Sequence, residues 1–265
     1  MAKGVIETWD KLEDFTRRSV KFDGVKRDVY VAGQGPGVII IHEVPGITPE
    51  VARFARMVRE AGYTVYMPSL LGKPGKPNSQ GYIDSQLFRV LCIAREFNVW
   101  AADDHSPIVD WLKQLAALAH KECGGKGVGA LGMCLTGNFA MSMMVEPSVL
   151  APVLCQPSLP ARNPGGIHAS PQDVAVVRAR LEAEDLTIKA YRFEGDPHCR
   201  AARFAAFKAA FGDRFEGEVL PDSAAKPDTF RKHPHSVVTS HLINKTGSLT
   251  RQKVDEIIGF FKQRL

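Results

Sequence analysis

Hydrophobic residues along this chain follow two alternating patterns. Short, nearly continuous apolar runs predict strands buried on both faces, and apolar residues recurring every three or four positions predict amphipathic helices. The predicted strands are 26–32, 38–44, 63–68, 127–133, 151–157, 186–193 and 215–220. The predicted helices are 49–61, 86–98, 107–118, 137–144, 171–184, 200–211 and 249–261. This alternation predicts an α/β fold, a single doubly wound domain with a mostly parallel central sheet.

The domain is expected to span residues 25–265, after a charged lead-in segment over residues 1–24. Residues 26–32 are expected to form an edge strand and residues 215–220 an outer strand. Residues 71–82 are rich in Gly, Pro, Lys and Ser, which predicts a surface loop able to cover a pocket.

The central strand is expected at Val38–Ile41, where four β-branched residues follow one another. It ends in two polar residues, His42 and Glu43, followed by Pro45-Gly46. Because α/β sheets place their chemistry at the carboxyl ends of the strands, this segment is a candidate part of a site.

The stretch from Gly127 to Met144 reads as a strand, a sharp turn and a helix, with Cys134 at the turn. A nucleophile between a strand and a helix is typical of the nucleophile elbow. The backbone N–H groups at the start of the new helix would favour a thiolate at Cys134. A cysteine in an apolar run is also often a small core residue, and the stretch alone does not separate the two interpretations.

An acid and a base follow the elbow. Asp196 ends the strand predicted at 186–193, and His235 lies in a polar loop before the last helix. Nucleophile, acid and then histidine is the chain order of α/β-hydrolases. Asp196 also sits in a Gly-Asp-Pro turn signal. The histidines that compete with His235 are His198, His233 and His241.

Three blocks of sequence resemble the dienelactone hydrolase family. Ile41–Gly46 is similar to the family's strand-end glutamate block, and Gly132–Gly137 to its Gly-x-Cys-x-Gly-Gly elbow. His235-Ser236 is similar to its catalytic histidine block, and Asp196 matches the family acid by position. The resemblance extends from about residue 25 to the C-terminus.

The resemblance implies the roles of the site residues. Cys134 is the nucleophile, Asp196 and His235 complete a catalytic triad, and Glu43 modulates the protonation of the thiol. The oxyanion hole is implied at the backbone N–H groups of Leu135 and Val44. The implied reaction is hydrolysis of a small ester or lactone through a thioester acyl-enzyme, without cofactor or metal.

Two residues depart from the family pattern. Thr136 replaces the second glycine of the elbow, which predicts a differently shaped turn. Thr239 follows the histidine by four residues, where dienelactone-cleaving members carry an arginine that holds the substrate carboxylate. Arg89 or Arg95 is a candidate for the family's other carboxylate clamp, and each is equally typical of a solvated helix residue. The identity of the ester or lactone therefore stays open.

Composition excludes several other classes. The chain has 34 Lys and Arg against 29 Asp and Glu, a net charge of +5, and its basic residues are scattered, which argues against nucleic-acid binding. Its 5 cysteines lack Cys-x-x-Cys spacing, which argues against a disulfide framework or zinc cage and favours a reducing, cytoplasmic location. The N-terminal residues lack an apolar signal core, and no apolar run reaches membrane-spanning length.

Two further motifs lack the sequence surroundings that a metal site or a dinucleotide-binding loop requires. His233-Pro234-His235 has no partner acid or cysteine at ligand spacing, so it is a weak metal signal. Gly33–Gly37 precedes a strand, whereas a dinucleotide-binding loop follows one. The expected partner is a small-molecule ester or lactone, and the chain is either a monomer or a homodimer.

Three alternatives come from other functional classes. The same fold is compatible with a binding or scaffold protein whose site is inactive. An acyltransferase would use the same elbow with an acceptor other than water. A thiol-dependent redox protein would need a resolving cysteine, and only the fold could bring Cys155 or Cys199 near Cys134.

Overall fold

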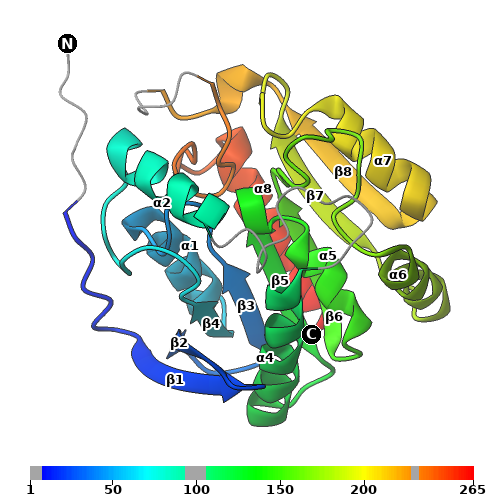
Figure 1. Cartoon of the computed structure of the whole chain (residues 1–265), viewed down its shortest axis with the longest axis horizontal. Coiled ribbons are helices and arrows are strands. Elements are labelled where there is room, and N and C mark those ends of the chain that lie inside the picture. The colour runs from blue at the N-terminus through cyan, green and yellow to red at the C-terminus, as the bar shows by residue number, and fades with distance from the viewer. Residues whose placement is uncertain (1–7, 93–105, 228–232) are drawn as a thin grey trace.

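The structure is a computed structural model that describes residues 8–92, 106–227 and 233–265. Its strands form one 8-stranded sheet in the order β1-β2-β4-β3-β5-β6-β7-β8 (Figure 1). The strands are β1 (Thr16–Phe22), β2 (Val25–Ala32), β3 (Gly37–Ile41), β4 (Thr64–Pro68), β5 (Val128–Met133), β6 (Val149–Cys155), β7 (Ile188–Phe193) and β8 (Phe215–Leu220). Strands β4, β3 and β5 to β8 run parallel, while β1–β2 and β2–β4 pair antiparallel. The predicted α/β fold with a mostly parallel sheet is confirmed.

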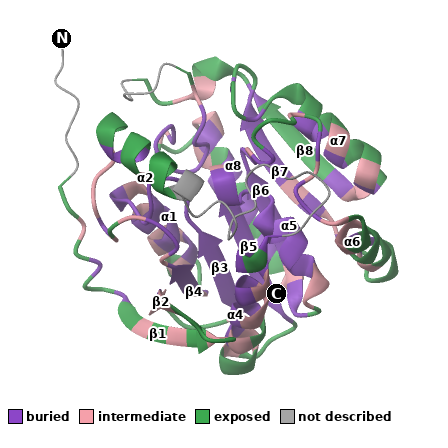
Figure 2. Ribbon diagram, in the orientation of Figure 1, coloured by how far each residue is buried: buried purple, intermediate pink, exposed green. Residues whose placement is uncertain are grey.

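The helices lie on both faces of this sheet. They are α1 (Pro49–Glu60), α2 (Gln80–Cys92), α4 (Pro107–Cys123), α5 (Phe139–Ser142), α6 (Pro171–Ala183), α7 (Ala201–Phe211) and α8 (Leu249–Arg264). Buried residues of α1 and α8 share one apolar cluster, and those of α4, α5, α6 and α7 share another. Strands β3 to β7, which lie between these two layers, are almost entirely buried, whereas β1 and most of β8 are exposed at the two sides of the sheet (Figure 2).

The central strand β3 shows why an uninterrupted apolar run is needed. Ile39 and Ile41 point into the cluster beneath α4, whereas Val38 and Ile40 point into the cluster beneath α1 and α8. All four side chains are fully buried. Helix α1 follows as predicted, with Thr48 as its N-cap, because the Thr48 hydroxyl accepts the N–H of Val51 at 3.4 Å.

Part of the lead-in segment expected over residues 1–24 belongs to the central sheet, while residues 1–7 lie outside the described residues. Residues Thr16–Phe22 form β1, which extends the sheet beyond β2, so β1 is the edge strand in place of residues 26–32. The alternation of apolar and polar residues in β1 is hard to recognise, because charged residues occur on both faces of the strand, as is common for an exposed edge strand. Arg18, for example, reaches across to Glu122 with an Nη1–Oε2 distance of 2.6 Å.

Two helices differ from their predictions. Helix α2 begins at Gln80, inside the loop predicted over 71–82, and the end of the helix predicted at 86–98 lies outside the described residues. The helix predicted at 137–144 is broken into a 3₁₀ turn at Cys134–Thr136, the single turn of α5 and a second 3₁₀ turn at Met143–Val145. A helix this short supplies little macrodipole, which weakens the dipole argument for a Cys134 thiolate.

The loop that precedes α2 is held at several points. Gly75 N–H donates to Ile47 O at 2.6 Å, and Asp10 N–H donates to Gly75 O at 2.9 Å. Asn78 Nδ2 donates to the hydroxyl of Ser240 at 3.4 Å. These contacts join the loop to the segment after β3 and to the polar loop that carries His235.

None of the helices in the described part of the chain combines the length and apolar character that crossing a bilayer requires.

Candidate active site

The register of the sheet brings the candidate residues together at the carboxyl ends of the parallel strands. Ile41 of β3 pairs with Gly132 of β5, so Glu43 and Cys134 each follow that pair by two residues. Met133 of β5 pairs with Cys155 of β6, and Cys155 pairs with Tyr191 of β7. The carboxyl ends of these four strands therefore lie side by side, as parallel α/β sheets arrange them.

Cys134 occupies a left-handed backbone conformation, with φ 56°, directly after β5. A non-glycine residue in this region is strained, as the nucleophile of an elbow is. A Cβ on Gly132 would lie 2.1 Å from Thr136 O, and one on Gly137 would lie 2.6 Å from Pro157 Cα. Both glycines are thus required by close backbone approach, and Cys134 is left half-buried at the tip of the turn.

Thr136, the departure from the family elbow, braces the turn. Its buried hydroxyl accepts the N–H of Met133 at 3.0 Å and lies 3.0 Å from the carbonyl oxygen of Ile41, to which it donates. The threonine therefore ties the elbow to the end of β3, and the turn keeps its sharp form without the second glycine.

His235 and Asp196 form a buried hydrogen-bonded pair. His235 Nδ1 donates to Asp196 Oδ2 at 2.7 Å, and both side chains are almost completely buried. The other carboxylate oxygen, Asp196 Oδ1, accepts the backbone N–H groups of His198 at 2.9 Å and Cys199 at 3.2 Å. The carboxylate is therefore fixed by its own loop and in turn fixes the imidazole.

The charges of this pair are coupled to Cys134. Burial disfavours the imidazolium, but the Cys134 thiolate and the hydrogen bond to Asp196 outweigh it and raise the pKa of His235 to about 10. Burial also opposes the carboxylate, yet the hydrogen bond from His235 and the two backbone N–H groups lower the pKa of Asp196. The protonated imidazole is therefore favoured between Asp196 and Cys134.

This raised pKa predicts a pH dependence of stability. Since the pKa of His235 rises from 6.5 to about 10 on folding, its stabilising effect is complete below about pH 6.5 and is lost as the pH rises toward 10. We expect the difference in unfolding free energy between the native protein and His235→Gln to shrink over that window. Urea denaturation at several pH values measures it, with His120→Gln, at the opposite edge of the sheet, as the control. A difference that stays constant from pH 6.5 to 10 would contradict the assignment.

Glu43 is held by hydroxyl groups of the loop that carries His235. Ser236 Oγ donates to Glu43 Oε2 at 2.6 Å, and the hydroxyl of Thr239 donates to Glu43 Oε1. Glu43 is 1% exposed and Thr239 is fully buried. Thr239 therefore contacts the glutamate, and its side chain is occupied in the protein interior where the family pattern has a substrate-binding arginine.

The competing histidines have other surroundings. His241 is buried, and its Nδ1 accepts the backbone N–H groups of His235 at 3.3 Å and Ser236 at 3.1 Å. His198 is exposed, with its ring centroid 5.4 Å from that of His235, and His233 is also exposed. Neither motif nor spacing pointed to the supporting role of His241, because it depends on how the loop folds back on itself.

His42, which the sequence placed at the candidate strand end without assigning it a role, is likewise a supporting residue. Its Nδ1 donates to Glu43 O at 2.8 Å, and its Nε2 accepts the N–H of Leu70 at 3.0 Å. Burial lowers the pKa of His42 to about 4, so the ring is neutral and joins the end of β3 to the loop after β4.

The remaining predicted residues are placed less directly at the site. Leu135 follows Cys134, and Val44 follows Glu43, so both lie at the same strand ends. Arg89 is exposed in the last turn of α2, and its described interactions do not include the triad. Arg95 lies outside the described residues.

The described residues contain no cluster of three or more side chains suited to a metal ion. Cys155 and Cys199 are free thiols, and burial raises the pKa of both. Two thiols held in their neutral form are poorly suited to resolve a disulfide with Cys134.

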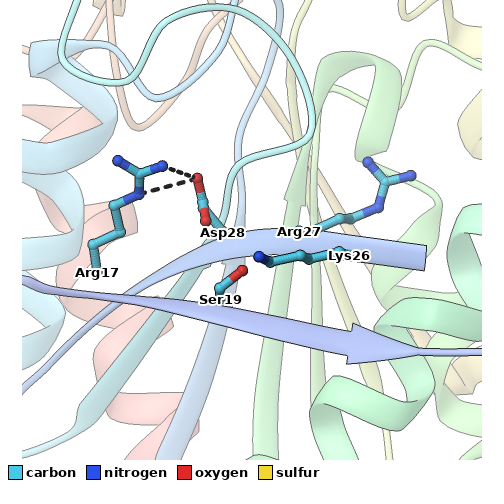
Figure 3. A pocket seen from close by; sticks show the side chains of 5 residues that line it. All are labelled: Arg17, Ser19, Lys26, Arg27 and Asp28. Carbon is cyan, nitrogen blue, oxygen red and sulfur yellow. Dashed lines mark hydrogen bonds and ion pairs between the residues drawn. The ribbon is translucent and has the colours of Figure 1, made fainter. Parts of the chain in front are cut away.

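A surface pocket lies on the β1–β2 hairpin (Figure 3). It is lined by Arg17, Ser19, Lys26, Arg27 and Asp28. Arg17 is already paired with Asp28, with an Nη2–Oδ2 distance of 2.6 Å. The pocket contains none of the candidate site residues, so it is a separate polar surface feature.

Comparison with known proteins decides the family. The model of the dienelactone hydrolase family matches residues 25–175, which is more than half of the chain. The chain belongs to the dienelactone hydrolase family. Membership of this family supports an ester or lactone hydrolase. A search of curated protein sequences finds no match to the chain.

Solved structures show the same fold. A dienelactone hydrolase from Anabaena variabilis ATCC 29413 is 13% identical, with a TM-score of 0.60 over 96% of this chain and 100% of that chain. A putative dienelactone hydrolase from Klebsiella pneumoniae is 14% identical, with a TM-score of 0.64 over 94% of this chain and 98% of that chain. The α/β-hydrolase fold is thus shared over nearly the whole length.

Proposed function

We propose that this protein hydrolyses a small carboxylic ester or lactone through a thioester on Cys134. The observation that carries the proposal is the coupled set of Asp196, His235 and Cys134 at the carboxyl edge of the sheet. The strained backbone at Cys134 and the family match support it further.

The reaction follows from the hydrogen bonds. Asp196 holds Nδ1 of His235, which leaves Nε2 as the atom that exchanges a proton with the thiol. The thiolate attacks the ester carbonyl carbon, and the oxyanion is stabilised by the backbone N–H groups of Leu135 and Val44. His235 returns the proton to the leaving oxygen, then accepts one from the water that hydrolyses the thioester.

Glu43 is proposed to modulate the thiol. Its carboxylate lies at the end of β3 and is held by two hydroxyls from the loop that contains His235. A reducing, cytoplasmic location suits such a thiol nucleophile.

Single-turnover kinetics with p-nitrophenyl acetate test the proposal. We expect a burst of nitrophenol and a mass increase of one acetyl group on the intact protein, located on Cys134 by peptide mapping, which decays as acetate is released. An added amine or alcohol that diverts the acetyl group more efficiently than water would favour an acyltransferase. A fully reduced protein that forms no adduct with a panel of esters and lactones would contradict hydrolysis and favour a binding protein.

A further inference from the structure

The turn that follows β6 contacts Cys134, the end of β7 and the loop that carries His235. Gln156, Pro157 and Ser158 continue directly from Cys155, the last residue of β6. They pack against the elbow from one side, because Gly137 lies so close to Pro157 that a side chain at Gly137 would collide with it. None of these three residues is part of the proposed triad or of the oxyanion hole.

Ser158 is bound to the nucleophile residue. Its backbone N–H donates to Cys134 O at 2.9 Å, which helps to fix Cys134 in its left-handed conformation. Its hydroxyl lies 3.8 Å from Cys134 Sγ, a hydrogen-bond distance for sulfur, and 3.0 Å from Gln156 O. Ser158 is half-buried beside the thiol.

Gln156 is bound to strand β7 and to the loop that carries His235. Its backbone N–H donates to Tyr191 O of β7 at 2.7 Å, five residues before Asp196. Its side-chain Oε1 accepts the N–H of Val237 at 3.2 Å, two residues after His235. The side chain of Gln156 is fully buried.

The conformation of Gln156 is unfavourable in itself. Its φ is 36°, a left-handed value that glycine or asparagine adopts more readily. Its Nε2 is buried and has no hydrogen-bond partner among the described residues. Local strain and an unsatisfied polar atom persist where the surrounding structure imposes them, and such positions cluster at functional sites.

We infer that the Gln156–Ser158 turn sets the position of the nucleophile relative to the general base. Ser158 holds the backbone of Cys134, and its single hydroxyl proton turns from Gln156 O to the sulfur when the thiolate forms. Gln156 is a positioning residue that acts through the backbone of the loop carrying His235, next to the two N–H groups held by His241. The inference rests on the proposed function, because it assigns both residues to the Cys134–His235 pair.

The first test measures the reactivity of the Cys134 thiol in an assay that does not depend on ester hydrolysis. The rate of Cys134 alkylation by iodoacetamide is followed against pH by peptide mass spectrometry in the native protein, Ser158→Ala and Gln156→Met. We expect the midpoint of the profile to move to higher pH in both variants, because each loses a group that stabilises the thiolate or places its imidazolium. Ser158→Thr, which keeps the hydroxyl, is expected to keep the native midpoint, as are the controls Ser223→Ala and Gln172→Met at exposed positions.

The second test uses turnover of p-nitrophenyl acetate. Gln156→Met is expected to lower kcat at least about tenfold with KM within about twofold, since a small displacement of a catalytic group slows chemistry more than binding. Gln156→Glu, which keeps the Oε1 acceptor, is expected to recover most of that loss. A melting temperature near the native value shows that each variant is folded.

The outcomes separate this inference from the proposed function. A native protein that alkylates but hydrolyses no ester refutes the hydrolase, and the alkylation profiles still decide the role of the turn. Unchanged midpoints in Ser158→Ala and in folded Gln156→Met overturn the inference. If Gln156→Met does not fold, the profile of Ser158→Ala decides alone.

Discussion

Replacing Cys134 with alanine is expected to abolish the acyl-enzyme and to lower kcat/KM for a small activated ester by at least about a thousandfold. The thiol is the proposed nucleophile, and the strained backbone of Cys134 is fixed by Thr136, Gly132 and Ser158 independently of the sulfur atom. The fold should therefore survive while the chemistry is lost. Intact mass after mixing with p-nitrophenyl acetate and steady-state turnover measure the two effects.

Two matched variants make this result specific. Cys123→Ala removes a half-buried thiol at the end of α4 and is expected to leave both the adduct and the rate unchanged. Cys134→Ser keeps the shape of the side chain and is expected to lose most activity, since a serine hydroxyl is harder to deprotonate than a thiol. An adduct that persists in Cys134→Ala would place the nucleophile elsewhere.

Asp196→Asn is expected to lower kcat by about a hundredfold to ten-thousandfold. Both carboxylate oxygens act as acceptors, because Oδ2 accepts from His235 and Oδ1 accepts from the N–H groups of His198 and Cys199. An amide places an NH₂ group where one of these acceptors is needed, and either the imidazole or the loop loses its partner. Removing the negative charge also lowers the pKa of His235 and shifts the pH–rate profile accordingly.

Asp213→Asn is the matched control. Its side chain is exposed and pairs with Lys208 at the surface, so kcat should stay within about twofold of the native value. A folded Asp196→Asn protein that retains native kcat and an unchanged pH profile would show that Asp196 does not orient the base.

The sequence predicted those features that depend on local pattern. Val38–Ile41 had to be central because an uninterrupted β-branched run needs apolar neighbours on both faces, and the structure buries it on both. The elbow at Cys134 was recognisable because a packed strand has no use for the glycines around it. His235 Nδ1 lies 2.7 Å from Asp196 Oδ2. The acid and the histidine that the chain order singled out are therefore side by side.

The supporting residues were not predictable, for identifiable reasons. The side chains of Gln156 and His241 accept hydrogen bonds from backbone N–H groups of the loop that carries His235. Such contacts depend on how the loop folds, and no periodicity in the sequence predicts them. Thr239 departs from the family pattern and leaves the substrate open, and only the fold shows that its side chain is buried against Glu43. Strand β1 was missed because an edge strand with charges on both faces lacks the apolar alternation that defines a strand.

The strand order has a consequence for synthesis on the ribosome. From β5 onward each new strand is added beside the previous one, so the sheet can grow outward as the chain emerges. The thiol of Cys134 is made well before Asp196 and His235, and the loop that binds Glu43 is among the last segments to appear. A nascent chain that stops before β7 therefore carries the cysteine without its proposed acid and base, so the proposed activation of the thiol depends on completion of the fold.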